Sequence, residues 1–185
     1  MKPENEKILL HACCGPCAVW PVERLREEGF DLEAYFFNPN IHPLKEFSRR
    51  KETFLTYARI KNLNVHISED FLQERWEAYA PDDPNRCVMC YKMRLKEAAR
   101  FAKENGYGGF TSTLFVSPYQ NHELMREIAL EFEEEFKIPF LYRDFRAGFR
   151  QGQSMAKEMG LYRQKYCGCI HSYNASPFKE KITWD

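Results

Sequence analysis

Short apolar runs alternate along this chain with longer amphipathic segments, and that alternation constrains the fold more than any other feature. Strands are predicted over the following residues: 7–11, 32–38, 64–67, 110–115 and 139–145. Helices are predicted between and after them: 16–29, 44–61, 70–79, 90–105, 121–136 and 153–159. Such alternation is typical of a parallel sheet with helices on both faces. We therefore expect a Rossmann-like α/β fold.

The length and composition are those of an ordinary globular protein. The 185 residues suit one α/β catalytic domain over 1–185, ending in a less regular C-terminal extension. No apolar run of about 18 residues occurs, so no membrane-spanning helix is expected. The apolar stretch near the N-terminus is too short for a signal peptide and includes His11, so we expect a cytoplasmic protein. The formal net charge of zero leaves a nucleic-acid partner open.

The cysteines fall into three tight clusters rather than being spread along the chain. They are Cys13, Cys14 and Cys17, then Cys87 and Cys90, then Cys167 and Cys169. A small secreted disulfide protein would be shorter, with an even number of cysteines at spread positions. Buried cysteines that serve only as packing groups have no reason to adopt CCxxC, CxxC and CxC spacings. The clusters therefore indicate metal or redox chemistry.

The first cluster lies between the first predicted strand and the first predicted helix. Ligands of parallel α/β sheets bind beyond the carboxyl ends of the strands. The segment HACCGPC stands where a nucleotide-binding sheet would carry a glycine-rich phosphate loop, and neither GxGxxG nor GxxxxGK[ST] occurs. A helix N-terminus favours ionised thiolates at that place. Together with the CxxC pair, four thiolates could bind either Zn²⁺ or an iron–sulfur cluster.

The remaining cysteines favour iron–sulfur over zinc. A structural zinc needs four ligands, whereas the first two clusters already hold five thiols. The CxC pair Cys167 and Cys169 can close a small, strained disulfide ring, and strained disulfides are typically the labile, catalytic ones. Zinc has no redox chemistry and would leave this pair without a task. A cluster beside a dithiol pair makes a plausible two-electron device.

The sequence resembles the cobalamin-independent epoxyqueuosine reductases of queuosine biosynthesis. The matching stretches run nearly end to end, in order: LLHACCGPC (9–17), FFNPNIHP (36–43), RCVMCYKMRL (86–95), TSTLFVSPYQNHE (111–123), YRDFR (142–146) and LYRQKYCGCIHS (161–172). The resemblance implies an adenine nucleotide α-hydrolase-like α/β fold. It also implies reduction of the epoxide of epoxyqueuosine, at the wobble position of tRNA, to queuosine.

The resemblance further assigns roles to the cysteines. The adjacent cysteines and the CxxC pair, Cys13, Cys14, Cys87 and Cys90, match residues assigned to a [4Fe-4S] cluster. Cys167 and Cys169 match a redox-active disulfide. Cys17 also matches a family cysteine, and we predict that it ligates metal, as part of an additional iron site beside the cluster. Spacing leaves open which of the first three cysteines hold the cluster.

The expected reaction needs an acid for the departing oxygen. We hypothesise that iron polarises the epoxide oxygen while electrons from an unidentified donor arrive through the cluster. The candidate proton donors are Asp144, Tyr119, His122 and Glu123. Asp144 is the first choice, because a carboxylate could alternatively bind the second iron.

Other polar residues have two interpretations each. His11 is expected to be a hydrogen-bonded interior histidine. His42 is expected to be exposed, either as a substrate contact or as a loop residue. Asn38 and Asn40 could read the hydroxyls of the modified base or form the turn around Pro39.

A basic and aromatic stretch next to the CxC pair predicts the tRNA-facing surface. The cationic candidates are Arg49, Arg50, Lys51, Arg143, Arg146, Arg150, Arg163 and Lys165. The aromatic residues interleaved with them are Phe145, Phe149, Tyr162 and Tyr166.

Three other classes of protein remain as alternatives. A zinc-stabilised RNA-binding module without redox activity would account for part of the cysteine pattern. An ATP-using tRNA-modifying enzyme would need the phosphate loop that this chain lacks. A thioredoxin-type oxidoreductase would use one CxxC motif and leave five cysteines unexplained.

Overall fold

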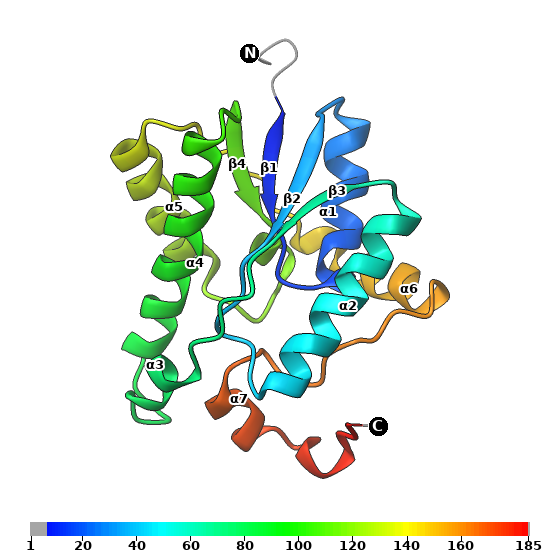
Figure 1. Ribbon diagram of the computed structural model, residues 1–185, viewed down its shortest axis with the longest axis vertical. Coiled ribbons are helices and arrows are strands. Elements are labelled where there is room, and N and C mark those ends of the chain that lie inside the picture. Colours follow the sequence, from blue (N-terminus) through cyan, green and yellow to red (C-terminus); the bar gives the residue numbers. More distant parts are fainter. Residues whose placement is uncertain (1–6, 185) are drawn as a thin grey trace.

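The computed structural model describes residues 7–184 and is built on a four-stranded parallel sheet in the order β3-β2-β1-β4 (Figure 1). The strands are β1 (Ile8–His11), β2 (Leu32–Phe36), β3 (Asn64–Ile67) and β4 (Gly109–Ser112). In the register, Leu10 lies beside Ala34 on one side and beside Thr111 on the other. All four residues of β1 are buried, as befits a central strand covered on both faces. The predicted Rossmann-like α/β fold is confirmed.

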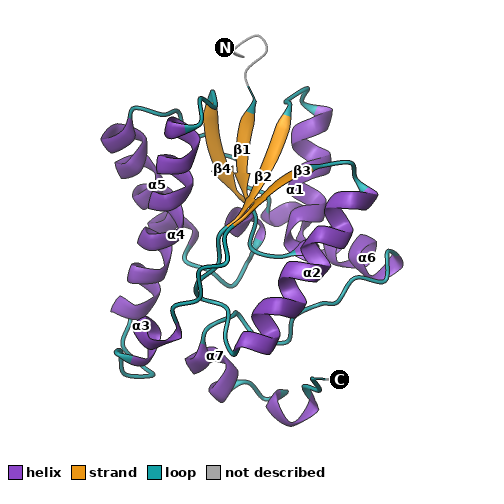
Figure 2. Ribbon diagram, viewed as in Figure 1, coloured by secondary structure: helices purple, strands orange, loops and turns teal. Residues whose placement is uncertain are grey.

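Helices cover both faces of the sheet (Figure 2). On one face lie α1 (Gly15–Glu27), α2 (Leu44–Ile60) and α6 (Phe149–Glu158). On the other lie α4 (Asn85–Glu104) and α5 (His122–Phe136). The short helices α3 (Gln73–Glu77) and α7 (Ile170–Ala175) lie beyond the carboxyl ends of the strands, at the bottom of the view. No helix within residues 7–184 combines the length and apolar character needed to cross a membrane.

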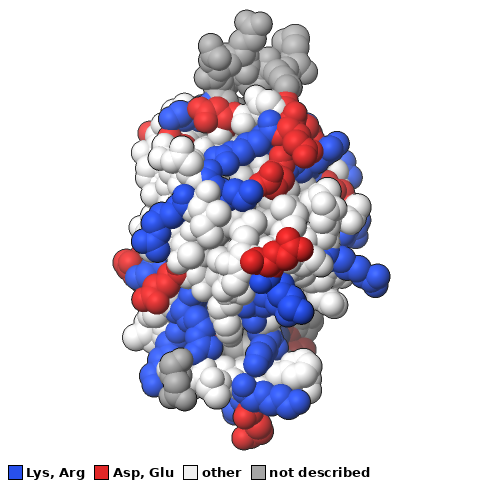
Figure 3. All heavy atoms as spheres, turned by 90° about the vertical axis from the view of Figure 1, so that its right-hand side faces the viewer, with Lys and Arg blue, Asp and Glu red and all other residues white. Residues whose placement is uncertain are grey.

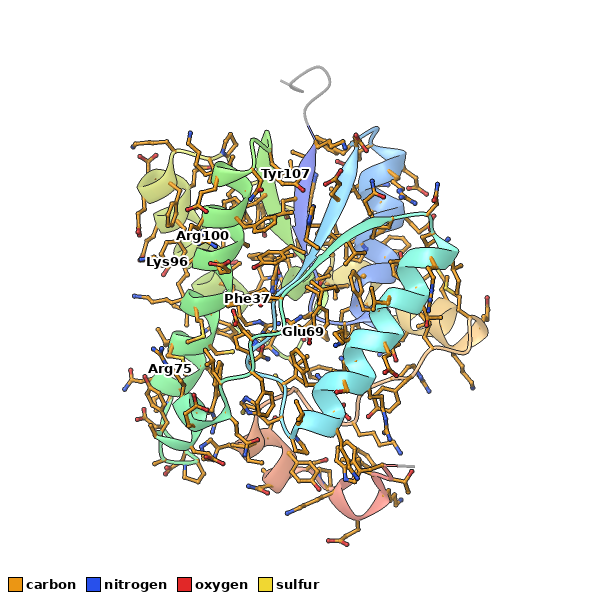
Figure 4. The ribbon with its side chains drawn as sticks, in the orientation of Figure 1. Phe37, Glu69, Arg75, Lys96, Arg100 and Tyr107 are labelled. Carbon is orange, nitrogen blue, oxygen red and sulfur yellow. The ribbon has the colours of Figure 1, made fainter. Side chains whose placement is uncertain are left out.

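The two ends of the sheet differ in the groups that occupy them (Figure 4). Tyr107 lies near the amino ends of the strands, where its hydroxyl donates to Glu33. Phe37 follows β2 at the carboxyl end, between α4 and the strand ends, and its carbonyl oxygen is 2.8 Å from His11 Nε2. Stacked and edge-on aromatic rings, such as Phe36 on Phe54, fill the space between the sheet and α2. Each such buried ring contributes about 1.5–3 kcal/mol to folding.

The prediction of a strand over 139–145 was wrong, and the strand predicted over 110–115 is shorter than expected. Phe140 forms only an isolated bridge to Phe110, through hydrogen bonds on either side of it. β4 ends at Ser112, whose side chain accepts a hydrogen bond from the Leu114 backbone and so begins a 3₁₀ helix, η1 (Thr113–Val116). Local side-chain capping therefore overrides the apolar pattern at this strand end.

Three helix predictions also need correction. Helix α4 begins at Asn85, because the Asp83 side chain accepts from the Asn85 backbone, so the CxxC pair lies inside the helix rather than before it. Helix α6 begins at Phe149, four residues earlier than expected, and α7 was not predicted. The helical spacing of apolar residues in 44–61 predicts that Leu44 faces inward, but it is 57% exposed.

Candidate metal and redox site

Three thiols lie close together in and just after the loop that joins β1 to α1. The sulfur atoms of Cys13, Cys14 and Cys17 all lie within 4.8 Å of one another. Cys14 is the N-cap of α1, and its sulfur accepts the Cys17 backbone N–H at 3.3 Å. The strand carries the loop to the edge of the sheet, and the first turn of the helix folds Cys17 back over it. This group, Cys13–Cys14–Cys17, is called the triad below.

The pKa values of the three thiols of the triad are shifted in different directions. Hydrogen bonds from Cys14 and Cys17 lower the pKa of Cys13 well below its usual value. Thr113 Oγ1 lies 3.1 Å from the same sulfur and donates to it. Burial raises the pKa of Cys14, and the hydrogen bond with Cys13 raises that of Cys17. Cys13 is therefore the most readily ionised thiol of the triad, and a thiophilic metal would displace protons from the thiols that bind it.

The CxxC pair lies on α4, outside this group. Cys87 is exposed and Cys90 is half-buried, and burial raises the pKa of Cys90 to about 11. Cys90 Sγ lies 4.0 Å from Arg94 Nη1. Among residues 7–184, no further His, Cys, Asp or Glu joins the triad within the 4.8 Å separation. The structure thus brings together the first cluster and leaves the second at a greater distance.

The CxC segment is fixed to the rest of the site by its backbone. Arg50 donates to the carbonyl oxygens of Cys167 and Tyr166, at 2.7 and 2.9 Å. Arg50 is itself paired with Glu46 at 2.8 Å, and both side chains are buried. Gln120 Nε2 lies 3.2 Å from Cys167 Sγ and donates to it. Cys167 is exposed whereas Cys169 is buried, and both are free thiols.

One cavity of about 1370 Å³ joins these groups. The triad and Cys167 line it, together with Arg94 from α4. Its volume exceeds that of a typical site for a drug-sized molecule, so it can admit a bulky nucleoside. Two of the three cysteine clusters therefore open onto a single space beyond the carboxyl ends of the strands.

Of the four candidate proton donors, only Tyr119 lines the cavity within residues 7–184. Both oxygens of Asp144 face Arg146, at 2.9 and 2.7 Å, and this pairing lowers the pKa of Asp144 to about 2. His122 Nε2 lies 2.8 Å from the Tyr142 hydroxyl. Asp144 as the proton donor therefore stays a prediction, and one that requires Arg146 to release it.

The polar residues at the end of β1 and in the loop after β2 differ in role: some hold the backbone in place through hydrogen bonds, and others line the cavity. The expectation of an interior, hydrogen-bonded His11 is confirmed, since its ring lies between Ser112 and the Phe37 carbonyl. The expectation of an exposed His42 was wrong: its ring is buried and accepts the Ile170 N–H at 3.0 Å. Asn38 donates to Ala12 and accepts from Arg94, so its amide is fully engaged.

Asn40 differs from Asn38. Its side chain lines the cavity, and its buried Oδ1 has no hydrogen-bond partner within residues 7–184. Asn40 therefore remains the better of the two for reading a substrate hydroxyl.

The predicted RNA-facing stretch is only partly available. Phe145, Tyr166 and Arg50 are buried and cannot meet a large partner. Arg50 and Tyr166 nevertheless line the cavity, as do the following members of that set: Arg49, Phe149, Tyr162, Arg163 and Lys165. On the face seen in Figure 3, Lys and Arg predominate over the lower part, toward the carboxyl-end side of the sheet.

Four residues that contact the thiols were missed from the sequence: Arg94, Thr113, Gln120 and Gln164. Arg94 follows Cys90 by four residues on a helix, so the spacing alone places both on one face. Thr113 comes directly after β4, at the edge where ligands bind. Nothing in the sequence pattern marks Gln120.

The donor set fits a thiophilic metal. Three thiols that lie close together and border a cavity can supply three of the four protein ligands of Zn²⁺ or of an iron–sulfur cluster. Hydrogen bonds to sulfur, such as that from Thr113, are the kind that tune such a centre. The triad can therefore hold a metal.

The fold and the site together define a Rossmann-like α/β protein, with helices on both faces of a parallel sheet, that carries three thiols directly after its first strand. A structure described as a predicted subunit of a tRNA methyltransferase from Methanocaldococcus jannaschii matches 94% of this chain and 88% of its own, with a TM-score of 0.56 and 13% identity. A deacetylase of teicoplanin biosynthesis matches with a TM-score of 0.53, 11% identity and 82% of each chain. These likenesses concern the fold alone.

Sequence comparison is more specific. The model of the family described as "Epoxyqueuosine reductase QueH" matches residues 8–175. The epoxyqueuosine reductase QueH of Dehalococcoides mccartyi is 34% identical over 172 residues, covering 90% of this chain and 92% of that protein. That of Thermotoga maritima is 33% identical over 175 residues, covering 89% of each. The chain belongs to the epoxyqueuosine reductase QueH family.

Proposed function

We propose that this protein is an oxidoreductase that reduces the epoxide of epoxyqueuosine in tRNA to the alkene of queuosine. The observation that supports it most directly is the triad opening, beside Cys167, onto one cavity large enough for a nucleoside. The reaction takes up two electrons and two protons: two C–O bonds break, a C=C bond forms, and the oxygen leaves as water. The family to which the chain belongs is named for this reaction.

The proposed cofactor is a [4Fe-4S] cluster, with an additional iron beside it. Its proposed ligands are the cysteines of the first two clusters: Cys13, Cys14, Cys17, Cys87 and Cys90. The convergence of the triad supports three of them, and Cys90 would supply a further thiolate from α4. When bound, these irons would supply single-electron transfer and a Lewis acid.

The chain's own residues would bind and protonate the substrate. Phe149 and Tyr162 offer rings at the cavity wall on which an unstacked base can stack. Asp144 is the proposed acid for the departing oxygen. Cys167 and Cys169 are the proposed redox pair: on closing to a disulfide, two thiols release two electrons and two protons, which matches the demand of the reaction.

The proposed partners are tRNA bearing epoxyqueuosine and a low-potential one-electron donor, and the proposed location is the cytoplasm. Arg49, Arg163 and Lys165, at the rim of the cavity, would meet phosphates. Binding should then weaken steeply with salt.

The decisive experiment is anaerobic purification followed by a count of iron, acid-labile sulfide and zinc. We expect about four or more irons with matching sulfide, and conversion of epoxyqueuosine-containing tRNA when a low-potential reductant is added. Zinc without sulfide, persisting after attempted cluster reconstitution, would instead favour a zinc-stabilised RNA-binding module. Iron and sulfide in the protein without conversion of the tRNA would support the proposed cofactor and contradict the proposed reaction.

A further inference from the structure

Arg94 is a buried cation that no carboxylate within residues 7–184 neutralises through an ion pair. Its side chain is 3% exposed. Nη2 donates to Asn38 Oδ1 at 3.0 Å, Nη1 lies 4.0 Å from Cys90 Sγ, and Nε has no hydrogen-bond partner among the described residues. A buried charge is strongly destabilising unless an anion compensates it. The structure therefore calls for negative charge beside Arg94.

The groups that can supply this charge are thiols. Arg94 acts electrostatically on Cys13, Cys90 and Cys167, one member of each cysteine cluster. It also lines the cavity shared by the triad and Cys167. Arg94 lies within helix α4 and its Nη2 donates to Asn38, and these two constraints hold the guanidinium near the three clusters.

The second buried arginine of the site shows the contrast. Arg50 is also 3% exposed, but Glu46 pairs with it at 2.8 Å, so that pair is internally neutral. Its remaining hydrogen bonds go to backbone carbonyls of the CxC segment. Arg50 therefore serves to attach a segment, whereas the charge of Arg94 is left for the sulfur groups.

We propose that Arg94 is the fixed counter-cation of the thiolate-bound metal centre and raises its reduction potential. This inference rests on the proposed function. Each electron that enters the centre adds negative charge, and a cation held a few ångströms away in a poorly solvated site stabilises the reduced form. Arg94 thus acts through the metal centre.

The test is a redox titration of the reconstituted protein, followed by electron paramagnetic resonance, for wild type, Arg94→Met and Arg94→Lys. Arg94→Met should reduce the ratio of reduced to oxidised centre about tenfold at a fixed potential, a shift of about 59 mV for a one-electron couple. Arg94→Lys should recover most of it. The matched control is Arg100→Met on the same helix, because Arg100 is half-exposed and paired with Glu97 and Glu104. It should leave the potential unchanged.

The other outcomes are also decisive. If Arg94→Met fails to assemble the centre while Arg94→Lys assembles it, with native circular dichroism in both, the requirement for charge stands. An equal shift or equal loss of the centre in both variants would assign Arg94 to geometry and overturn the proposal. So would an unchanged potential combined with weaker tRNA binding. If the wild-type protein binds only zinc, the proposed function is contradicted, and the zinc affinities of the same variants are then compared. Weaker zinc binding in Arg94→Met but not in Arg94→Lys would again support the role of Arg94 as a counter-cation.

Discussion

Arg50 and Cys167, separated by 117 positions in the sequence, are joined by a hydrogen bond of 2.7 Å from the guanidinium to the cysteine's carbonyl oxygen. The same guanidinium reaches Tyr166 and pairs with Glu46. One side chain of α2 thereby sets the position of the CxC segment against the triad. This link makes the buried ion pair a part of the candidate site.

Breaking that pair should loosen the CxC segment. Glu46→Gln leaves Arg50 buried without its anion, and we expect a loss of about 3–5 kcal/mol in the free energy of unfolding. Amide hydrogen exchange of residues 162–172 should rise at the same time. Lys51→Ala is the control, because Lys51 pairs with the exposed Glu69 and should cost less than about 1 kcal/mol. Unchanged exchange in Glu46→Gln would contradict the anchoring role.

Removing a thiol of the triad should remove the metal. Cys14→Ala should lower the iron content of anaerobically reconstituted protein at least about tenfold, because loss of one ligand from a closely spaced set disrupts the site. Cys87→Ala is the informative comparison, since Cys87 is exposed and lies outside that set. Equal iron in Cys14→Ala and wild type would exclude the triad as ligands. Loss in both variants would mean that the CxxC pair closes on the triad when iron binds.

Asp144→Asn tests the proposed proton donor. If Asp144 protonates the departing oxygen, turnover should fall about 10²-fold or more while iron content and tRNA affinity stay unchanged. Arg146→Ala should free the carboxyl group, because the hydrogen bonds from Arg146 keep the pKa of Asp144 low. Full turnover and full metal content in Asp144→Asn would rule out both the acid role and the iron-ligand role. Tyr119, at the cavity wall, would then be the next residue to replace.

Stability should fall on mild acidification because of buried histidines. Burial lowers the pKa of His42 to about 4, below its unfolded value of about 6.5, so the unfolded chain binds more protons between these values. The associated stability is complete above pH 6.5 and is lost as the pH falls toward 4, by about 1–3 kcal/mol. Urea unfolding of the metal-free protein at pH 7, 5.5 and 4.5 measures this loss. His42→Gln should flatten the dependence relative to wild type, whereas His66→Gln, at a half-exposed side chain, should not.

The sequence predicts the sheet well because its strands are set by a local pattern. The strand 64–67 and the helix that precedes it end within a residue of their expected positions, and Pro43 marks the start of that helix. The failures lie where a single side chain decides the outcome. Ser112 turns the end of β4 into a 3₁₀ helix, and Asp83 starts α4 ahead of Cys87.

The candidate site, too, has a part that local sequence patterns predict and a part that they do not. Cys13, Cys14 and Cys17 could be grouped from the sequence because they are near neighbours on one turn. The hydrogen bond between His42 and Ile170 and that between Arg94 and Asn38 join segments 50 or more residues apart, and sequence periodicity cannot predict such contacts. Fold-level reasoning places the site at the correct edge of the sheet, but the charges around the sulfurs appear only in three dimensions.

The cavity wall that faces the triad comes from the far end of the polypeptide. Gln164 contacts Cys17 across 147 positions, and Arg50 meets Tyr166 across 116. During synthesis on the ribosome, the three thiols therefore emerge and stay uncovered until almost all of the chain has followed. Metal can be delivered to them in that interval without passing a closed wall, and oxidants have the same access.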